Sequence, residues 1–249
     1  MKTLKIILTE IQPLLFINRS NSFWILSLSI FVLLSCGKEE NPTISLEDGL
    51  STVILDLPGD TEASMGQQVP GKVKREFHSL LFRFRDKRQI WLKTKEDSTK
   101  WFKSKDWDIA FTGPYNSEIY INNASDPNNP AYQGESKQAR ILLIKQAYQH
   151  VHTAPSDQQF EASEVSKVGW AGSEGSDGWY TYSIKNHLMQ PLPNRTYVIR
   201  LPDQNYAKLQ LINVYKGNPS AVTNLDWPKP YLTFKYYVQI DGSKNLKTN

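Results

Sequence analysis

Residues 231–240 read YLTFKYYVQI, and apolar side chains occupy every second position: Leu232, Phe234, Tyr236, Val238 and Ile240. In an extended chain, side chains two residues apart point to the same face. This alternation therefore predicts a β-strand with one buried face.

Similar short runs fill the rest of the chain from residue 51 onward, separated by turn-forming residues. They are residues 51–57, 78–84, 89–94, 106–111, 118–122, 139–147, 179–184, 196–201 and 206–215. Residues 78–84 and 89–94 are expected to form a hairpin across Asp86-Lys87-Arg88, and residues 106–111 and 118–122 another across Gly113-Pro114. Only residues 156–160 resemble a helix, of a single turn, so we predict an all-β fold.

Two of these runs carry more detailed expectations. The strand at 51–57 should place Val53, Leu55 and Leu57 on one face, and residues 141–144 are apolar on both faces, as in a buried central strand. Two loops, 60–72 and 123–137, are long and polar. The sequence thus predicts a single domain, an antiparallel sheet or sandwich of short strands with long polar loops.

The N-terminal segment has the pattern of a bacterial lipoprotein signal. The apolar run at 23–34 is too short for a membrane span of about 20 residues but suits a signal-peptide core, and Lys2, Lys5 and Arg19 precede it. It ends at Leu33-Leu34-Ser35-Cys36, which resembles a lipobox. Cys36 is the only cysteine, so the alternative to a lipid anchor is a free buried thiol.

These features predict a signal peptide at 1–35, a flexible tether at 36–45 and a β domain at 46–249. The protein would be secreted and anchored by Cys36 to the outer membrane, at the cell surface. The formal net charge of the whole chain is +4, from 29 basic and 25 acidic residues. This near balance gives no reason to expect a nucleic-acid partner.

Known catalytic motifs are absent from the sequence. It contains no Gly-rich phosphate loop, no His-Glu-x-x-His and no Gly-x-Ser-x-Gly. We therefore predict that the protein is not an enzyme.

The histidines are the candidate ligands for a metal or haem. His78 lies on the apolar side of its predicted strand, where a structural role is favoured. His150 and His152 share one face if extended, and they form either a metal-binding pair or a solvated pair before Pro155. His187 and Met189 are also two residues apart, and imidazole and thioether both ligate haem iron.

The order of several motifs resembles the HmuY family of haem-binding surface lipoproteins. The similar segments are Trp107-Asp108-Ile109-Ala110-Phe111, residues 118–123, Ala154-Pro155-Ser156-Asp157, Gly178-Trp179-Tyr180, residues 194–200, Ala207-Lys208-Leu209-Gln210 and residues 232–236. The resemblance implies an all-β fold that holds haem between two axial side chains and delivers it to an outer-membrane receptor.

The family's axial ligands do not carry over to this sequence. In the best-known member one axial histidine lies five residues after the Gly-Trp tryptophan, and Ile184 stands at that position here. The other lies in an insert before Gly-Trp, and the shorter stretch 160–177 contains no histidine. Relatives that use methionine keep Met189 as a candidate.

Two axial atoms must approach iron from opposite sides, about 4 Å apart with metal–nitrogen bonds of about 2 Å. Neighbours on one face of one strand cannot do this. We therefore expect His187 or Met189 to ligate haem on one side and His150 or His152 on the other.

Two alternatives remain. The first is an HmuY-like binding module without haem. The second is a polysaccharide-binding surface protein or enzyme, in which surface tryptophans stack on sugars, although these tryptophans more readily suit core and hairpin packing: Trp91, Trp101, Trp170 and Trp227.

Overall fold

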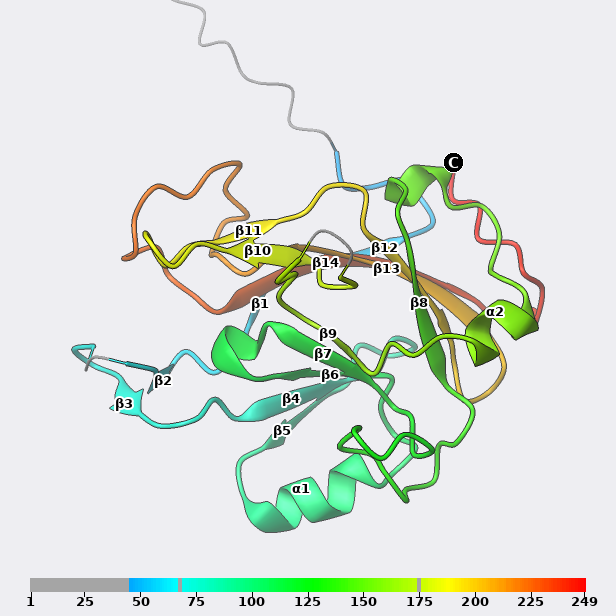
Figure 1. Cartoon of the computed structure of the whole chain (residues 1–249), viewed down its shortest axis with the longest axis horizontal. Helices are drawn as coiled ribbons and strands as arrows, with labels where there is room; N and C mark the ends of the chain where they lie inside the picture. Colours follow the sequence, from blue (N-terminus) through cyan, green and yellow to red (C-terminus); the bar gives the residue numbers. More distant parts are fainter. Residues whose placement is uncertain (1–44, 67–68, 174–175) are drawn as a thin grey trace, which may run out of the picture. The chain divides into compact units, whose positions relative to one another are not determined.

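The computed structural model describes residues 45–66, 69–173 and 176–249, which belong to one compact unit (Figure 1). The predicted signal peptide, Cys36 and residues 36–44 of the predicted tether lie outside the described residues. No helix within the described ranges is long and apolar enough to cross a membrane.

Two antiparallel five-stranded sheets form the two layers of a sandwich, which confirms the predicted all-β class. The first sheet has the order β1-β14-β13-β12-β8, with β1 (Thr52–Pro58), β8 (Arg140–Ile144), β12 (Thr196–Arg200), β13 (Tyr206–Asn213) and β14 (Tyr231–Gln239). The second has the order β5-β4-β6-β7-β9, with β4 (Ser79–Phe82), β5 (Gln89–Leu92), β6 (Ile109–Thr112), β7 (Glu118–Ile121) and β9 (Lys167–Val168).

The remaining elements are short. They are β2 (Ala63–Ser64), β3 (Val73–Lys74), β10 (Tyr180–Tyr182), β11 (Met189–Pro191), α1 (Lys95–Phe102), α2 (Asp157–Glu161) and the 3-10 helices η1 (Pro114–Asn116) and η2 (Tyr148–His150). The two predicted hairpins are confirmed, since β4 pairs with β5 and β6 with β7.

The core lies between the two sheets and is centred on aromatic rings. Phe234 of β14 packs against Phe82 of β4 and Phe111 of β6, with 5.3 Å between ring centroids in each pair. Leu232 and Tyr236 are buried on the same face of β14. The alternation read from residues 231–240 therefore describes the strand correctly as far as Val238, but Ile240 is 80% exposed because the strand ends at Gln239.

Both sheets are also covered on their outer faces. Phe160 of α2 and Leu246 of the C-terminal segment pack on Val198 of the first sheet. Trp107 and Ala131 pack on Leu81 of the second sheet, with Phe102 of α1 beside them. Burial on both faces explains why several strands are apolar at consecutive positions rather than at alternate ones.

Three expectations are corrected by the structure. Strand β8 is an edge strand, not a central one; it is apolar on both faces because the core and the outer cluster cover one face each. Leu55 is 62% exposed, because β1 changes register between Ile54 and Leu57, where Asp56 has a φ of 52°. Helix α1 was not predicted, because its sequence has no apolar stripe. In agreement with this, none of its residues is buried.

Candidate functional site

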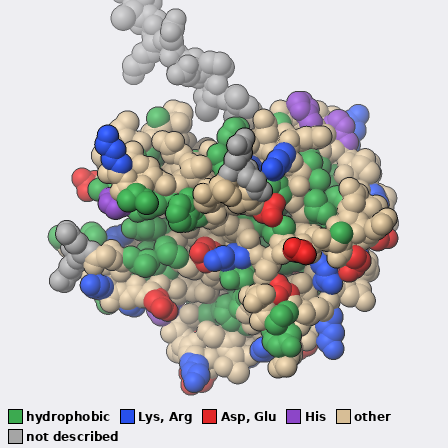
Figure 2. All heavy atoms as spheres, viewed as in Figure 1, with side chains coloured by type: hydrophobic (Ala, Val, Ile, Leu, Met, Phe, Trp, Pro, Cys, Tyr) green, Lys and Arg blue, Asp and Glu red, His purple; other side chains and the backbone are tan. Residues whose placement is uncertain are grey.

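Three segments far apart in the sequence meet at one end of the sandwich, which we call the hairpin end. They are the β10–β11 hairpin, the segment 60–75 that carries β2 and β3 (the arm), and the segment 214–230 between β13 and β14. Figure 1 draws all three at the left of the view, and Figure 2 shows hydrophobic side chains gathered there. Six of the exposed large apolar residues lie on or beside these segments: Met65, Val69, Val73, Trp170, Ile184 and Leu225.

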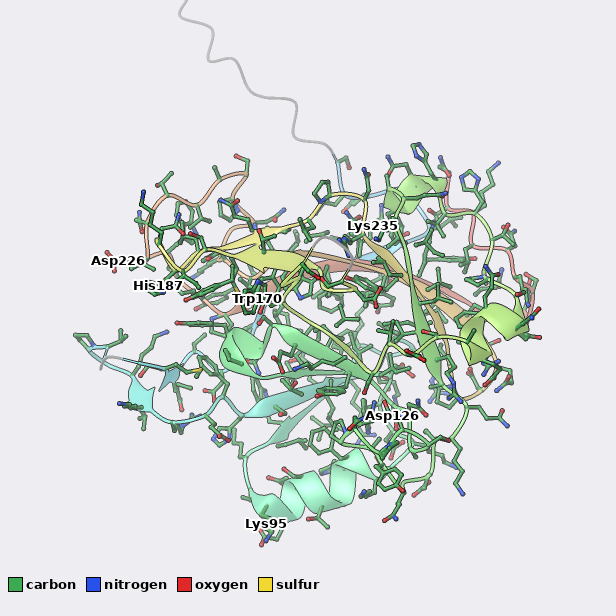
Figure 3. All side chains as sticks on the ribbon, viewed as in Figure 1. Lys95, Asp126, Trp170, His187, Asp226 and Lys235 are labelled. Carbon is green, nitrogen blue, oxygen red and sulfur yellow. The ribbon has the colours of Figure 1, made fainter. Side chains whose placement is uncertain are left out.

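His187 lies in the turn of the β10–β11 hairpin and is exposed to solvent (Figure 3). Its backbone has a φ of 54°, and its N–H donates to the Ser183 carbonyl. The hydroxyl of Tyr182 lies 2.8 Å from Nδ1 of the imidazole. When Nδ1 donates its proton to this hydroxyl oxygen, Nε2 keeps a free lone pair, as a metal ligand requires.

Met189, the second candidate of this hairpin, has a different environment. It pairs with Tyr182 across the hairpin, and its side chain is only 5% exposed within the core between the sheets. Its backbone N–H donates to the Tyr215 hydroxyl at 3.0 Å. The thioether of Met189 is therefore covered, whereas the imidazole of His187 is open to ligands.

Aromatic rings surround the base of the hairpin. Trp170 is 53% exposed and meets Tyr182 edge to face, with 6.3 Å between ring centroids. Tyr115 of η1 packs against Phe77 at 5.1 Å. Burial raises the pKa of both Tyr115 and Tyr215, and the neighbouring Tyr182 raises each further, so these phenols stay protonated at neutral pH.

The arm is held to the sandwich at its base. Asp60 is buried, forms an ion pair with Arg75, and accepts the backbone N–H of His78 at 2.8 Å. Its own N–H donates to Asn116 Oδ1 at 2.7 Å. Beyond this base the arm exposes Met65, Val69 and Val73, at 49%, 43% and 58%.

Lys229 belongs to the segment 214–230 and contacts the arm. Its Nζ lies 5.5 Å from the ring centroid of Tyr115 and 5.7 Å from that of Tyr215. Its carbonyl accepts a hydrogen bond from Lys72 Nζ of the arm at 3.2 Å.

His150 and His152 lie elsewhere. They are in and after η2, not in the strand that the sequence predicted, so the argument that they share a strand face does not hold. Both are exposed, and His152 Nε2 is 2.8 Å from the Gln149 carbonyl. Both alternatives that the sequence left open for this pair, metal binding and solvation, stay predictions.

The structure does not bring His150 or His152 near the hairpin end. Lys208 of β13 contacts the carbonyls of Tyr148 and Val151, on the outer face of the first sheet. Tyr215, which contacts Met189, follows Lys208 by seven residues and lies in the inner core. At about 3.3 Å per residue, the two places are on the order of 20 Å apart, and axial ligands must be about 4 Å apart.

The remaining candidate residues are His78 and three tryptophans, and each lies against other parts of the protein. His78 borders a hollow of about 160 Å³ together with Asp60 and Trp91. Trp91 and Trp227 pack against the main core, and Trp101 lies under Arg88 and Lys100. Among the described residues no group of three or more His, Cys, Asp or Glu side chains could hold a metal ion.

A second hollow, of about 380 Å³, lies on the outer face of the second sheet. Phe102, Tyr120 and Asn128 are among the residues that border it. No histidine is among the residues that border it.

Comparisons with known proteins give no match at the level of sequence families: no family model and no curated protein matches the chain. Solved structures do match. An HmuY-like haem-binding protein of Bacteroides vulgatus is 13% identical over 64% of this chain and 84% of its own, with a TM-score of 0.33.

Two further matches cover more of this chain. The apo HmuY analogue of Tannerella forsythia is 13% identical over 77% of this chain and 95% of its own, with a TM-score of 0.34. Apo PinO of Porphyromonas gingivitis is 12% identical over 76% and 95%, with a TM-score of 0.33. Two of these three structures carry the HmuY name, but because the TM-scores lie below 0.5 they carry no argument about function.

Proposed function

We propose that this protein is a lipid-anchored cell-surface protein that binds haem at the hairpin end and passes it to an outer-membrane receptor. The observation that carries the proposal is His187, an exposed imidazole whose other nitrogen is engaged by Tyr182. It lies in the hairpin that follows Gly178-Trp179, the motif after which the HmuY-like family carries one of its axial histidines. Ile184, at the matched position, is in the turn of the same hairpin.

The donor chemistry of the hairpin end suits haem. Imidazole and thioether are both axial ligands of haem iron, and the arm exposes the thioether of Met65. Apolar and aromatic surface for the porphyrin comes from Trp170, Ile184 and Val73. When bound, haem would supply a Lewis-acidic iron, and we propose that His187 and Met65 would hold it.

Met65 replaces the partner expected from the sequence, since His150 and His152 lie far from His187. Met189 could ligate only after the hairpin detached from the core. Tyr182 is proposed as a positioning residue, because its hydroxyl sets the tautomer and orientation of the His187 ring.

Haem titration read by the Soret band tests this proposal. We expect His187→Ala and Met65→Ala each to shift the Soret band and to lower haem affinity by at least about 10-fold, the lower range for losing a supporting residue of a metal site. Tyr182→Phe should weaken affinity less, with the band position retained.

His150→Ala and His152→Ala serve as matched controls, since they remove exposed imidazoles outside the hairpin end, and we expect no change. Met189→Ala should lower thermal stability rather than shift the Soret band. If the wild type leaves the Soret band of free haem unchanged, the protein is instead an HmuY-like module for another ligand. If it binds haem and His187→Ala is unchanged, the ligand assignment is wrong.

A further inference from the structure

Lys229 is a half-buried ammonium group between two tyrosine rings. Its Nζ donates to the Leu225 carbonyl at 2.6 Å and lies over the rings of Tyr115 and Tyr215. Burial lowers the pKa of Lys229, and the nearby Lys72 lowers it further, whereas Asp226 opposes this shift. A partly desolvated cation in such a place gains most from a nearby negative charge.

The protein does not supply that charge by direct contact. Across residues 45–66, 69–173 and 176–249, neither Lys229 nor Lys72 forms an ion pair with a carboxylate. Lys72 Nζ has the Lys229 carbonyl as its hydrogen-bond acceptor. The ammonium group of Lys72 thus lies beside the backbone of Lys229, and both lysines keep donor protons to spare.

Two hydroxyl groups accompany the lysines. The Tyr215 hydroxyl accepts the Met189 N–H, so its own proton is available. Lys229 Nζ lies 5.5 Å and 5.7 Å from the ring centroids of Tyr115 and Tyr215, so the two phenols flank the same ammonium group. Burial raises the pKa of both phenols, and they stay protonated at neutral pH. Ammonium and phenol donors together form the donor set that a carboxylate prefers, and charge-assisted hydrogen bonds of this kind are the strong ones.

We infer that Lys229 and Lys72, with the hydroxyls of Tyr115 and Tyr215, form an anion subsite for a carboxylate group of an amphipathic ligand whose apolar body covers the exposed residues of the hairpin end. The inference rests on the proposed function for the place of the ligand, but not on its axial ligands. It adds a charge requirement: the ligand must be a flat or extended apolar molecule with a carboxylate.

Iron-free protoporphyrin IX and its dimethyl ester, compared by quenching of tryptophan fluorescence, test the subsite. The ester has the same apolar ring without the carboxylates, and neither probe has iron to ligate. A charge-assisted hydrogen bond contributes about 1.5–3 kcal/mol, so we expect the wild type to bind the free acid about 10-fold or more tightly than the ester. In Lys229→Met the two probes should bind within about 2-fold of each other.

Lys216→Met is the matched control, because Lys216 belongs to the same segment but lies over the ring of Tyr231 rather than over Tyr115 or Tyr215. It should keep the preference for the acid, and circular dichroism checks that each variant folds. A wild type that binds neither probe, or both equally, or a Lys229→Met variant that still prefers the acid, overturns the inference. If the wild type prefers the acid but His187→Ala leaves haem binding unchanged, the assignment of His187 as an iron ligand is rejected. The anion subsite is not affected by that result.

Discussion

The ammonium group of Lys208 is fully buried and lies 3.0 Å from the hydroxyl of Thr248, one residue before the end of the sequence. The same Nζ donates to the Tyr148 and Val151 carbonyls, at 3.2 Å each. Strand β13, the helix η2 and the C-terminal segment are therefore joined by one side chain on the outer face of the first sheet.

Because Lys208 is buried, the free energy of unfolding should change with pH in the alkaline range. Desolvation lowers the pKa of Lys208 from 10.5 to about 8. Between these values the unfolded chain holds the proton that the folded chain has lost, so the free energy of unfolding should rise with pH from about 8 to 10.5. We expect a gain of about 3 kcal/mol, measured by urea unfolding at several pH values.

Lys208→Met should reduce this rise, whatever the loss of hydrogen bonds does to absolute stability. Lys244→Met removes an exposed lysine that pairs with Asp157, and it should keep the wild-type slope. A wild-type stability that is flat or falls between pH 8 and 10 would contradict the account of Lys208.

The carboxyl group of Asp108 predicts a second pH dependence of the free energy of unfolding, at acidic pH. Here stability falls as pH rises. Burial raises its pKa from 3.8 to about 6, although its carboxylate accepts the Phe84 N–H at 2.7 Å. The folded chain therefore binds the proton more tightly, and the free energy of unfolding should fall by about 3 kcal/mol as pH rises from about 4 to 6.

Asp108→Asn keeps an oxygen to accept the Phe84 N–H and removes the titration, so it should lack this fall and be more stable than the wild type at pH 7. Asp106→Asn changes a carboxylate two residues away that is 42% exposed and pairs with Arg83. It is the control, and thermal unfolding at pH 4, 5, 6 and 7 distinguishes the two variants.

Phe234 and Ile240 belong to the same alternating pattern but differ in burial. Phe234 is fully buried between the sheets, and Ile240 is 80% exposed. Phe234→Ala should lower the free energy of unfolding by about 3–5 kcal/mol, as expected for a cavity between Phe82 and Phe111. Ile240→Ala should change it by less than about 0.5 kcal/mol. Equal effects in denaturant titrations would contradict the placement of β14.

The lipid anchor predicted at Cys36 lies outside the described residues and is tested in cells. Cys36→Ala removes the thiol that would carry the acyl chains, so the protein should no longer take up labelled palmitate or partition with membranes. Ser35→Ala keeps both the thiol and a small residue before it and is the matched control. Normal partitioning of Cys36→Ala would show that the lipobox interpretation is wrong.

Much of the fold could be predicted from the sequence because local patterns determine it. Alternation at residues 231–240 and two turns, Asp86-Lys87-Arg88 and Gly113-Pro114, predicted strands and hairpins that the structure contains. The turn of helix at α2 was predicted at Ser156, which caps it. Helix α1 also has a capping box, formed by Thr94 and Asp97, and this local signal could have revealed it without an apolar stripe.

Other properties depend on which segments cover each other, and a local pattern does not contain that information. An apolar run such as 141–144 looks the same in a central strand and in an edge strand covered on both faces. Leu55 and Leu57 share a predicted face until a bulge, stabilised by contacts with β14, turns one of them to solvent.

In the candidate site, too, local sequence determined some features and the packing of distant segments determined others. The sequence by itself determined that His187 and Met189 follow the Gly178-Trp179 motif, and the structure adds that His187 lies in the turn of the β10–β11 hairpin. Only the tertiary structure decided its neighbours: it places η2 with His150 on the outer face of the first sheet, and it brings Lys72, Tyr115 and Lys229 together. Sequence spacing sets the direction of side chains within a segment, whereas the packing of two sheets decides which distant segments meet.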